Sequence, residues 1–105
     1  MRRGEVWWAN LPKPVGTRPV LLLSRDAAYK VRTSVTVAPI TRKTRSIPTE
    51  VRLGTKDGMP DRCVANLDSI LTVPKSLLSE RVTALTSEKM VEVREAIMFA
   101  LDLEI

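Results

Sequence analysis

Arg18-Pro19-Val20-Leu21-Leu22-Leu23-Ser24 is the stretch of this sequence that decides the fold. An arginine and a proline precede four consecutive apolar residues, and a serine follows them. A run of this length, rich in Val and Leu and bounded by turn-forming residues, predicts a strand that is buried on both faces. Proline is tolerated where a strand begins, because its missing N–H falls outside the ladder. We therefore expect Arg18 at the mouth of a central strand, where its charged head reaches solvent while its stem packs.

A second strand is predicted from Ser34 to Ala38, and it runs on into Pro39-Ile40-Thr41. The β-branched residues of this segment favour extended backbone. If the two strands pair antiparallel, the start of the first lies beside the end of the second. This pairing would bring Arg18 and Thr41 together at one rim of the sheet.

The rest of the chain predicts further short strands and one helix. Strand-like composition recurs at residues 5–11, 49–53, 63–66, 70–73 and 81–85. Thr86 is suited to cap a helix at its N-terminus. The apolar face of this helix is expected to carry Met90, Val93, Ile97 and Leu101. We predict a single domain, residues 1–105, of the mainly β class with a C-terminal helix, built as a small antiparallel sheet or half-open barrel.

Two adjacent tryptophans, Trp7 and Trp8, occupy the first predicted strand. Neighbouring side chains on a strand point to opposite faces, so the two indoles cannot enter the same core. One is expected to pack inward. The other is expected at a second buried surface, a partner interface or a ligand platform.

The positive charge of the chain is concentrated in its first half. Residues 1–52 hold 11 Lys and Arg against 3 Asp and Glu, whereas residues 53–105 hold 6 against 9. A basic half of this kind favours binding to phosphate groups or to an acidic peptide. A solvated surface that only keeps the protein soluble is the alternative.

Several classes of site and location are disfavoured by composition. The chain has no histidine, so the commonest catalytic acid or base and a common metal ligand are unavailable. We expect no cofactor. Its one cysteine, Cys63, cannot form an internal disulfide, which fits a reducing compartment. No apolar stretch approaches the roughly 20 residues of a membrane span. We expect a cytoplasmic protein.

Three segments together resemble the MazF/PemK toxin family of bacterial toxin–antitoxin modules. They are Arg3-Gly4-Glu5-Val6-Trp7, the stretch from Arg18 to Ser24, and Val37-Ala38-Pro39-Ile40-Thr41. Ala65-Asn66-Leu67-Asp68-Ser69-Ile70 and the segment from Arg81 to Thr86 match as well. The resemblance covers essentially the whole chain.

This resemblance implies a fold and an activity. Members of the family are homodimeric, metal-independent endoribonucleases with an SH3-like barrel related to the gyrase poison CcdB. They cut single-stranded RNA at short sequences, and an antitoxin with an acidic, disordered tail silences them. The family's catalytic arginine and threonine fall on Arg18 and Thr41, the pair that strand pairing had already placed together.

RNA supplies its own nucleophile, the 2′-hydroxyl, so positioning and electrostatics can provide much of the catalysis. Arg18 offers a planar set of donors that matches phosphate oxygens, and we assign it charge stabilisation. Thr41 is expected to orient the 2′-hydroxyl. The residues expected to follow the RNA backbone are Arg42, Lys43 and Arg45. The candidates for reading base edges are Lys13, Thr17, Asn66 and Asp68, although an aspartate in a tight turn more often caps its own backbone.

The chain departs from the family pattern at two places. Lys13 to Thr17 lacks the glutamate that many members carry just before the arginine, and Asn66 stands where some members have an arginine. Two other functions stay open: a non-catalytic SH3-like module that binds nucleic acid or protein, and a gyrase-directed toxin of the CcdB type. The C-terminal Leu103-Glu104-Ile105 counts against the gyrase toxin, which ends in tryptophan, glycine and isoleucine.

Overall fold

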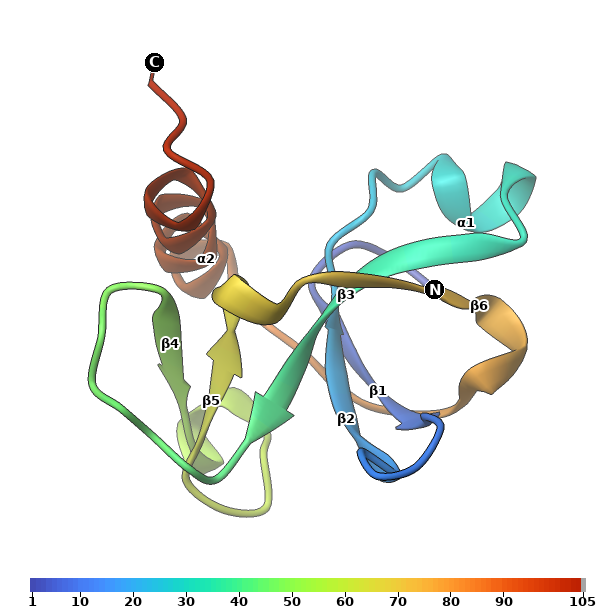
Figure 1. The fold of residues 1–105 in the computed structure, drawn as a ribbon, viewed down its shortest axis with the longest axis horizontal. Helices are drawn as coiled ribbons and strands as arrows, with labels where there is room; N and C mark the ends of the chain where they lie inside the picture. The colour runs from blue at the N-terminus through green and yellow to red at the C-terminus, as the bar shows by residue number, and fades with distance from the viewer. Residues whose placement is uncertain (105) are drawn as a thin grey trace.

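β2 (Thr17–Leu22) forms the middle of the sheet and pairs antiparallel with β1 (Glu5–Asn10) and with β3 (Ser34–Thr41). The structure, a computed structural model, describes residues 1–104. Within them, seven strands form one bent sheet in the order β4-β5-β3-β2-β1-β7, and β6 also pairs with β3 (Figure 1). The remaining elements are α1 (Ala28–Val31), β4 (Glu50–Leu53), β5 (Cys63–Asn66), β6 (Leu71–Pro74), β7 (Leu78–Ala84) and α2 (Ser87–Ala100), with short 3-10 turns η1 (Thr55–Asp57), η2 (Leu67–Ser69) and η3 (Lys75–Leu77). The expected mainly β fold with a C-terminal helix is confirmed.

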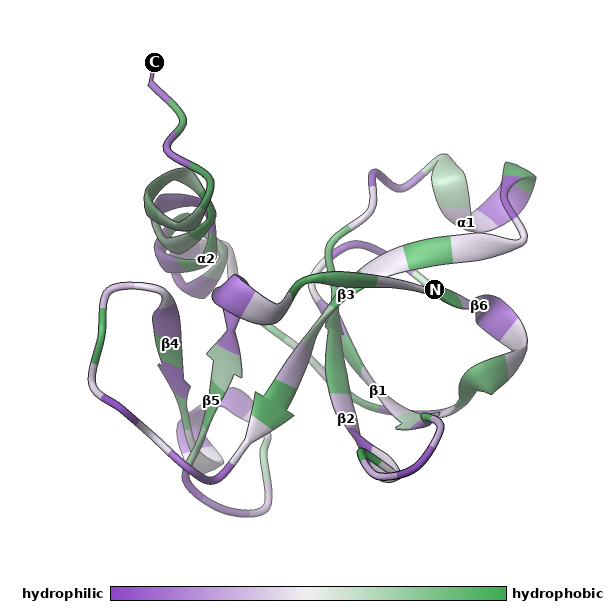
Figure 2. Cartoon of the chain, in the orientation of Figure 1, coloured by the Kyte–Doolittle hydropathy of each residue, from purple (hydrophilic) through white to green (hydrophobic). Residues whose placement is uncertain are grey.

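Burial on both faces of the central strand separates two hydrophobic cores. Leu21 and Leu23 pack into the first core, which also contains Val93 of α2. Val20 and Leu22 pack into the second core. Val20, Leu21 and Leu22 have no exposed surface at all, so each contributes about 1.5–3 kcal/mol of hydrophobic stabilisation. The prediction of a strand buried on both faces is confirmed, and Figure 2 shows the hydrophobic residues along β2.

α2 covers the first core with one of its faces. Thr86 caps the helix, because its Oγ1 accepts a hydrogen bond from the Lys89 backbone N–H at 3.1 Å. Val93 and Ala96 are buried in the first core. The prediction that Leu101 continues this face was wrong, since the helix ends one residue earlier and Leu101 is 56% exposed.

β1 keeps the expected alternation of its side chains, although its pairing with β7 is irregular. The register against β7 shifts between Val6 and Trp7 and again between Trp8 and Ala9, with the extra residues in β7. Val6 packs into the first core and Ala9 into the second, and neither has exposed surface, whereas both tryptophans stay partly exposed. Trp7 packs against the second core, and Trp8 lies beside Pro19 in a small surface hollow.

β3 continues past the end of its ladder with β2. This ladder stops at the pair Val20–Pro39, and beyond this point Ile40 and Thr41 pair only with β5, which lies along the other edge of β3. Pro39 has no backbone N–H to donate, which favours the end of the first ladder here. β2 and β3 therefore diverge before Arg18 and Thr41 can pair, and Figure 1 shows the two strands separating at this end.

Glu5 links β1 to β7 and to the N-terminal residues. Its Oε1 accepts hydrogen bonds from Trp7 Nε1 and from the Arg2 backbone N–H, both at 3.0 Å, and its Oε2 lies 3.2 Å from Arg81 Nε. Burial raises the pKa of Glu5, but the hydrogen bonds and the nearby positive charges outweigh burial and hold the pKa below its ordinary value of 4.5. The ionised carboxylate is thus part of the folded state.

We predict that Glu5→Gln lowers the free energy of unfolding by about 1 kcal/mol near neutral pH. Because the folded state keeps the pKa of Glu5 low, the contribution of the carboxylate is present above about pH 4.5 and is lost as pH falls through the folded pKa. Urea unfolding followed by circular dichroism should therefore give a difference between wild type and variant that shrinks as the pH falls below about 4.5. Glu95→Gln, at an exposed position of α2, is the control. A difference that does not depend on pH would contradict the prediction.

Candidate functional site

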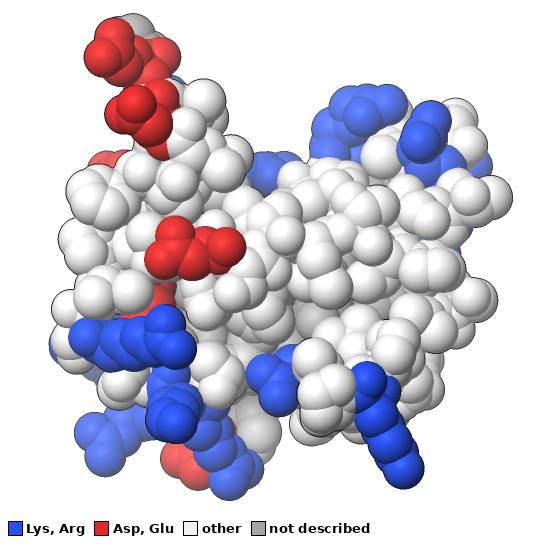
Figure 3. Space-filling view, in the orientation of Figure 1, with Lys and Arg blue, Asp and Glu red and all other residues white. Residues whose placement is uncertain are grey.

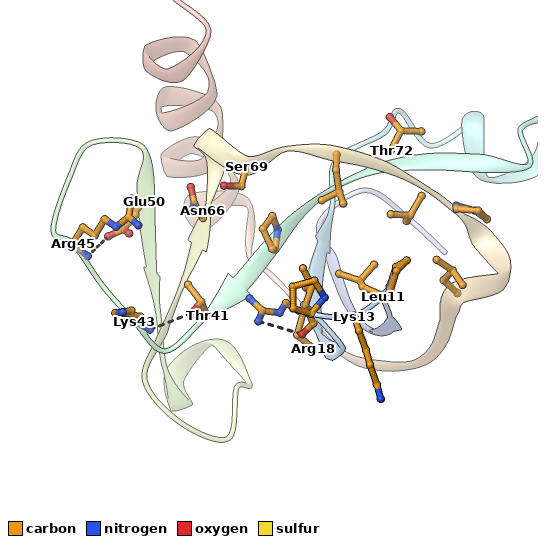
Figure 4. Close-up of a pocket in the computed structure, with 18 residues that line it drawn as sticks. Leu11, Lys13, Arg18, Thr41, Lys43, Arg45, Glu50, Asn66, Ser69 and Thr72 are labelled. Atoms are coloured by element: carbon orange, nitrogen blue, oxygen red, sulfur yellow. Dashed lines mark hydrogen bonds between the residues drawn. The ribbon is translucent and has the colours of Figure 1, made fainter.

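A cavity of about 700 Å³ opens where β2 and β3 diverge. The loop between β1 and β2 forms one wall, and β3, β5 and β6 form the others (Figure 4). Arg18 and Thr41 both line it, one from the start of β2 and one from the end of β3. The structure thus brings to one cavity the two residues predicted to meet at the rim of the sheet.

Arg18 has few partners in the protein. One of its terminal nitrogens, Nη2, donates to the Val15 carbonyl oxygen over a long 3.5 Å. Its Nε–H is buried and has no hydrogen-bond acceptor within residues 1–104. Buried donors without a partner are rare and costly, which makes such a group a candidate for binding a ligand. No carboxylate of the described residues forms an ion pair with Arg18, so its charge is available to an anion in the cavity.

Thr41 is oriented by the backbone that follows it. Its Oγ1 accepts a hydrogen bond from the Lys43 backbone N–H at 3.2 Å, as the dashed line in Figure 4 marks. Because that bond uses the oxygen as acceptor, the hydroxyl hydrogen stays free to donate. Thr41 is therefore a positioned hydroxyl at the edge of the cavity.

Asn66 and Glu50 lie directly opposite each other on β5 and β4, and both line the cavity. Their neighbours Val51 and Ala65 face the first core, so strand alternation turns Asn66 and Glu50 the other way. Asn66 Oδ1 accepts a hydrogen bond from the Asp68 backbone N–H at 2.9 Å. A backbone N–H can only donate, so this bond fixes the amide orientation and leaves the Asn66 NH₂ group as a pair of donors for a ligand.

Glu50 is a cavity residue that sequence reasoning missed. Its Oε1 accepts hydrogen bonds from the backbone N–H groups of Arg45 at 2.9 Å and Ser46 at 3.0 Å, and from Thr44 Oγ1 at 3.1 Å. Ser46 has a positive φ of 53°, which turns successive N–H groups towards one point and forms an anion-binding concavity. Glu50 thereby shapes the basic loop between β3 and β4. A lone acidic residue soon after a basic segment was the signal in the sequence.

The other predicted site residues divide into two groups. Lys13, Lys43 and Arg45 line the cavity. Three others do not, namely Thr17, Arg42 and Asp68. Each of the three has a partner elsewhere. Thr17 donates to Asn10 Oδ1 at 3.1 Å, Arg42 lies 3.9 Å from Asp61, and Asp68 Oδ2 accepts a hydrogen bond from the buried Thr49 hydroxyl at 2.6 Å.

The described part of the chain offers no metal centre of the usual kind. Residues 1–104 contain no group of three or more His, Cys, Asp or Glu side chains that could hold a metal ion. Nor does any helix of these residues combine the length and the apolar composition needed to cross a membrane. The polar groups that line the cavity are guanidinium, ammonium, hydroxyl and amide groups and the carboxylate of Glu50.

Comparison with known proteins identifies relatives of the whole chain. Curated sequences of Mycobacterium tuberculosis include the probable endoribonuclease MazF2, 38% identical over 93 residues, which covers 88% of this chain and 89% of the relative. The probable endoribonuclease MazF5 of the same species is 39% identical over 101 residues and covers 95% of this chain and 92% of the relative.

Solved structures agree with the sequence comparison. The Mycobacterium tuberculosis toxin MazF-mt6 superposes with a TM-score of 0.89 at 33% identity, covering 96% of this chain and 99% of that one. A mycobacterial endoribonuclease in complex with its cognate antitoxin gives a TM-score of 0.88 at 28% identity, covering 100% of this chain and 98% of that one. The family model described as PemK-like, MazF-like toxin of type II toxin–antitoxin system matches residues 2–101. The chain therefore belongs to the PemK-like, MazF-like family of toxins of type II toxin–antitoxin systems.

Proposed function

We propose that this MazF-like endoribonuclease toxin cuts single-stranded RNA at a short recognition sequence in the cavity between β2 and β3, without a metal ion. The observation that carries the proposal is Arg18, whose buried Nε–H has no acceptor and whose charge has no carboxylate partner within residues 1–104. A phosphate group would supply both the missing acceptor and the missing charge. The names of the relatives favour a nuclease over the gyrase-directed and non-catalytic alternatives.

The reaction needs no nucleophile from the protein. The RNA 2′-oxygen attacks the adjacent phosphorus, the bond from phosphorus to the 5′-oxygen breaks, and the products carry a 2′,3′-cyclic phosphate and a 5′-hydroxyl. The 2′-hydroxyl loses its proton and the departing 5′-oxygen gains one. Arg18 stabilises the negative charge that builds up on the phosphoryl oxygens, and Thr41 orients the 2′-hydroxyl by hydrogen bonding.

The basic residues around the cavity hold the RNA strand. Lys13, Lys43 and Arg45 contact phosphates, so they add affinity that depends on salt and carries little sequence information. Asn66 contributes to sequence selection, because its NH₂ group presents two donors to the acceptors of a base edge. Thr17 and Asp68 act indirectly, through the hydrogen bonds that fix the first loop and Thr49.

A cognate antitoxin and a second copy of the chain are the proposed protein partners. The antitoxin complex of a structural neighbour supports the first, and an acidic, disordered tail would compete with RNA for the basic cavity. The second is supported by apolar side chains that stay exposed in and after α2, with Phe99 at 63% and Leu101 at 56%. We place the action of this toxin in the cytoplasm, where its RNA substrate lies.

Purified wild-type protein is expected to cut a mixed-sequence RNA in the presence of EDTA and to leave 5′-hydroxyl ends. Arg18→Ala should reduce the rate by about 100-fold or more, since removing one preorganised donor to a developing oxyanion has an effect of this size. Arg32→Ala, at an exposed position just after α1, is the matched control and should keep the wild-type rate. Equal rates for wild type and Arg18→Ala would show that Arg18 has no role in the reaction. Cleavage only with added divalent metal would contradict the metal-independent mechanism.

The identity of the attacking group can be tested on the substrate. Once a cut site has been mapped, a single 2′-deoxynucleotide placed immediately 5′ to the scissile bond should abolish cleavage there, because no 2′-oxygen remains to attack. The same substitution one nucleotide further away should leave cleavage in place. Gel analysis of end-labelled RNA measures both, and cleavage at the deoxy position would exclude the 2′-hydroxyl mechanism.

Asn66 has two roles that different substitutions separate. Asn66→Ser keeps an oxygen that can cap the Asp68 N–H, whereas Asn66→Ala removes it, so only Asn66→Ala should lower the free energy of unfolding, by about 1 kcal/mol. Both variants lose the amide donors. In both, we expect the ratio of the cleavage rate at the preferred sequence to that at other sequences to fall about tenfold. Thermal unfolding and sequencing of the RNA ends measure the two effects. Unchanged selectivity in both variants would show that Asn66 does not read a base.

A further inference from the structure

The surface that carries the cavity continues across β4 and β5. Thr41 pairs with Val64 of β5, and Val64 pairs with Arg52 of β4. Directly opposite residues of antiparallel strands point to the same face of a sheet. Thr41 and Arg52 therefore stand on one face, and Asn66 and Glu50 lie on the same face two residues further along their strands.

A second cavity, of about 610 Å³, lies at the end of β4 and β5 beyond Thr41, where Arg52 and Val64 of this face line it. Arg42, Arg52 and Arg62 line it, together with a single carboxylate, that of Asp61. The charge of this lining is therefore strongly positive. Figure 3 shows Lys and Arg side chains gathered around β4 and the loop that joins it to β3.

These arginines are weakly engaged by the protein. Arg62 has no side-chain hydrogen bond or ion pair within residues 1–104, and Arg52 makes only a long hydrogen bond of 3.4 Å to Ser46 Oγ. Arg42 lies 3.9 Å from Asp61, with side-chain exposures of 79% and 61%. An exposed pair at this distance contributes little to stability, so all three guanidinium groups can turn to an external anion.

Cys63, which also lines the second cavity, does not make it a reactive centre. Burial raises the pKa of the Cys63 thiol, and the carboxylates of Asp57 and Asp61 raise it further. The thiolate is the reactive form of cysteine, and a raised pKa keeps Cys63 in the weakly nucleophilic thiol form near neutral pH. The chemistry of this cavity is that of anion binding.

We propose that Arg42, Arg52 and Arg62 form a second phosphate-binding site, which holds the RNA backbone where the strand leaves the cleavage cavity past Thr41. The inference rests on the proposed nuclease function for the direction of the strand. Arginine suits this role because its planar donors match phosphate oxygens. Continuity of the face with Thr41 favours RNA over an acidic peptide, since a strand whose phosphate lies at Thr41 has its next phosphates within reach of the arginines. The antitoxin is the alternative occupant that the experiment must separate.

The experiment compares a short and a long RNA that contain the same mapped cut site. The short RNA ends at its recognition sequence and so fills the cleavage cavity alone, whereas an RNA of about 20 nucleotides continues past Thr41 to the arginines. The ratio of kcat/KM for the long RNA to that for the short RNA should fall about tenfold in the double variant Arg52→Gln, Arg62→Gln. The salt dependence of long-RNA binding should also become less steep, by about 0.7 for each lost phosphate contact. The control, Arg25→Gln with Arg32→Gln, removes the same charge from exposed positions around α1, at the far side of the molecule in Figure 1.

Each outcome decides the proposal. A ratio that falls in Arg52→Gln, Arg62→Gln and not in the control supports the second site, and a ratio equal to that of wild type overturns it. An unchanged ratio combined with weaker inhibition by the antitoxin would assign the arginines to the acidic peptide instead. If wild-type protein cuts neither RNA, the nuclease proposal fails separately, and fluorescence anisotropy with the 20-nucleotide RNA still decides the site. Lower affinity of the double variant alone supports it, and equal affinity of all three proteins overturns it.

Discussion

The burial of one strand on both of its faces is the constraint on which the rest of this structure depends. Val20 and Leu22 fill one core while Leu21 and Leu23 fill the other, so β2 cannot shift by a single residue without exchanging the two sets. This fixes the register of β1 on one side and of β3 on the other. The position of Arg18, just before the buried run, is fixed with it. A flexible and charged side chain thus starts from a backbone that has very little freedom.

The cavity between β2 and β3 exists because this rigid sheet divides. The ladder between the two strands ends at Pro39 while β3 continues beside β5, so the two walls of the cavity belong to different parts of the sheet. Arg18 is held by one wall and Thr41 by the other. Glu50 orders the loop between β3 and β4, because its carboxylate accepts hydrogen bonds from two backbone N–H groups of that loop. These bonds help to fix the positions of Lys43 and Arg45 at the cavity. The Glu50 carboxylate thus orders the loop whose basic side chains are proposed to bind the phosphates of RNA.

The features of the fold and of the cavity that could be predicted from the sequence are those that depend on residues close together in the chain. The apolar run after Arg18 and the hydroxyl at the end of the next strand are local patterns, and they located the cavity correctly. Glu50, and Arg52 of the proposed second site, were missed, because their positions on the cavity face follow from the register of β4 against β5, which composition does not specify. Leu101 fits the helical period, but the helix ends before it. The irregular register between β1 and β7 likewise depends on how the two strands pair, and nothing in the tryptophan pair itself predicts it.

The position of α2 in the chain has a consequence for biosynthesis. The helix follows all seven strands of the described residues, so a ribosome makes it after them. It contributes Val93 and Ala96 to the core on which Val51 of β4 and Ala65 of β5 also rest. While α2 is still within the exit tunnel, the wall that carries Asn66 and Glu50 lacks the element packed behind it. Translation of all seven strands and of α2 therefore precedes assembly of both walls, so the cavity between β2 and β3 is incomplete while α2 is still in the tunnel.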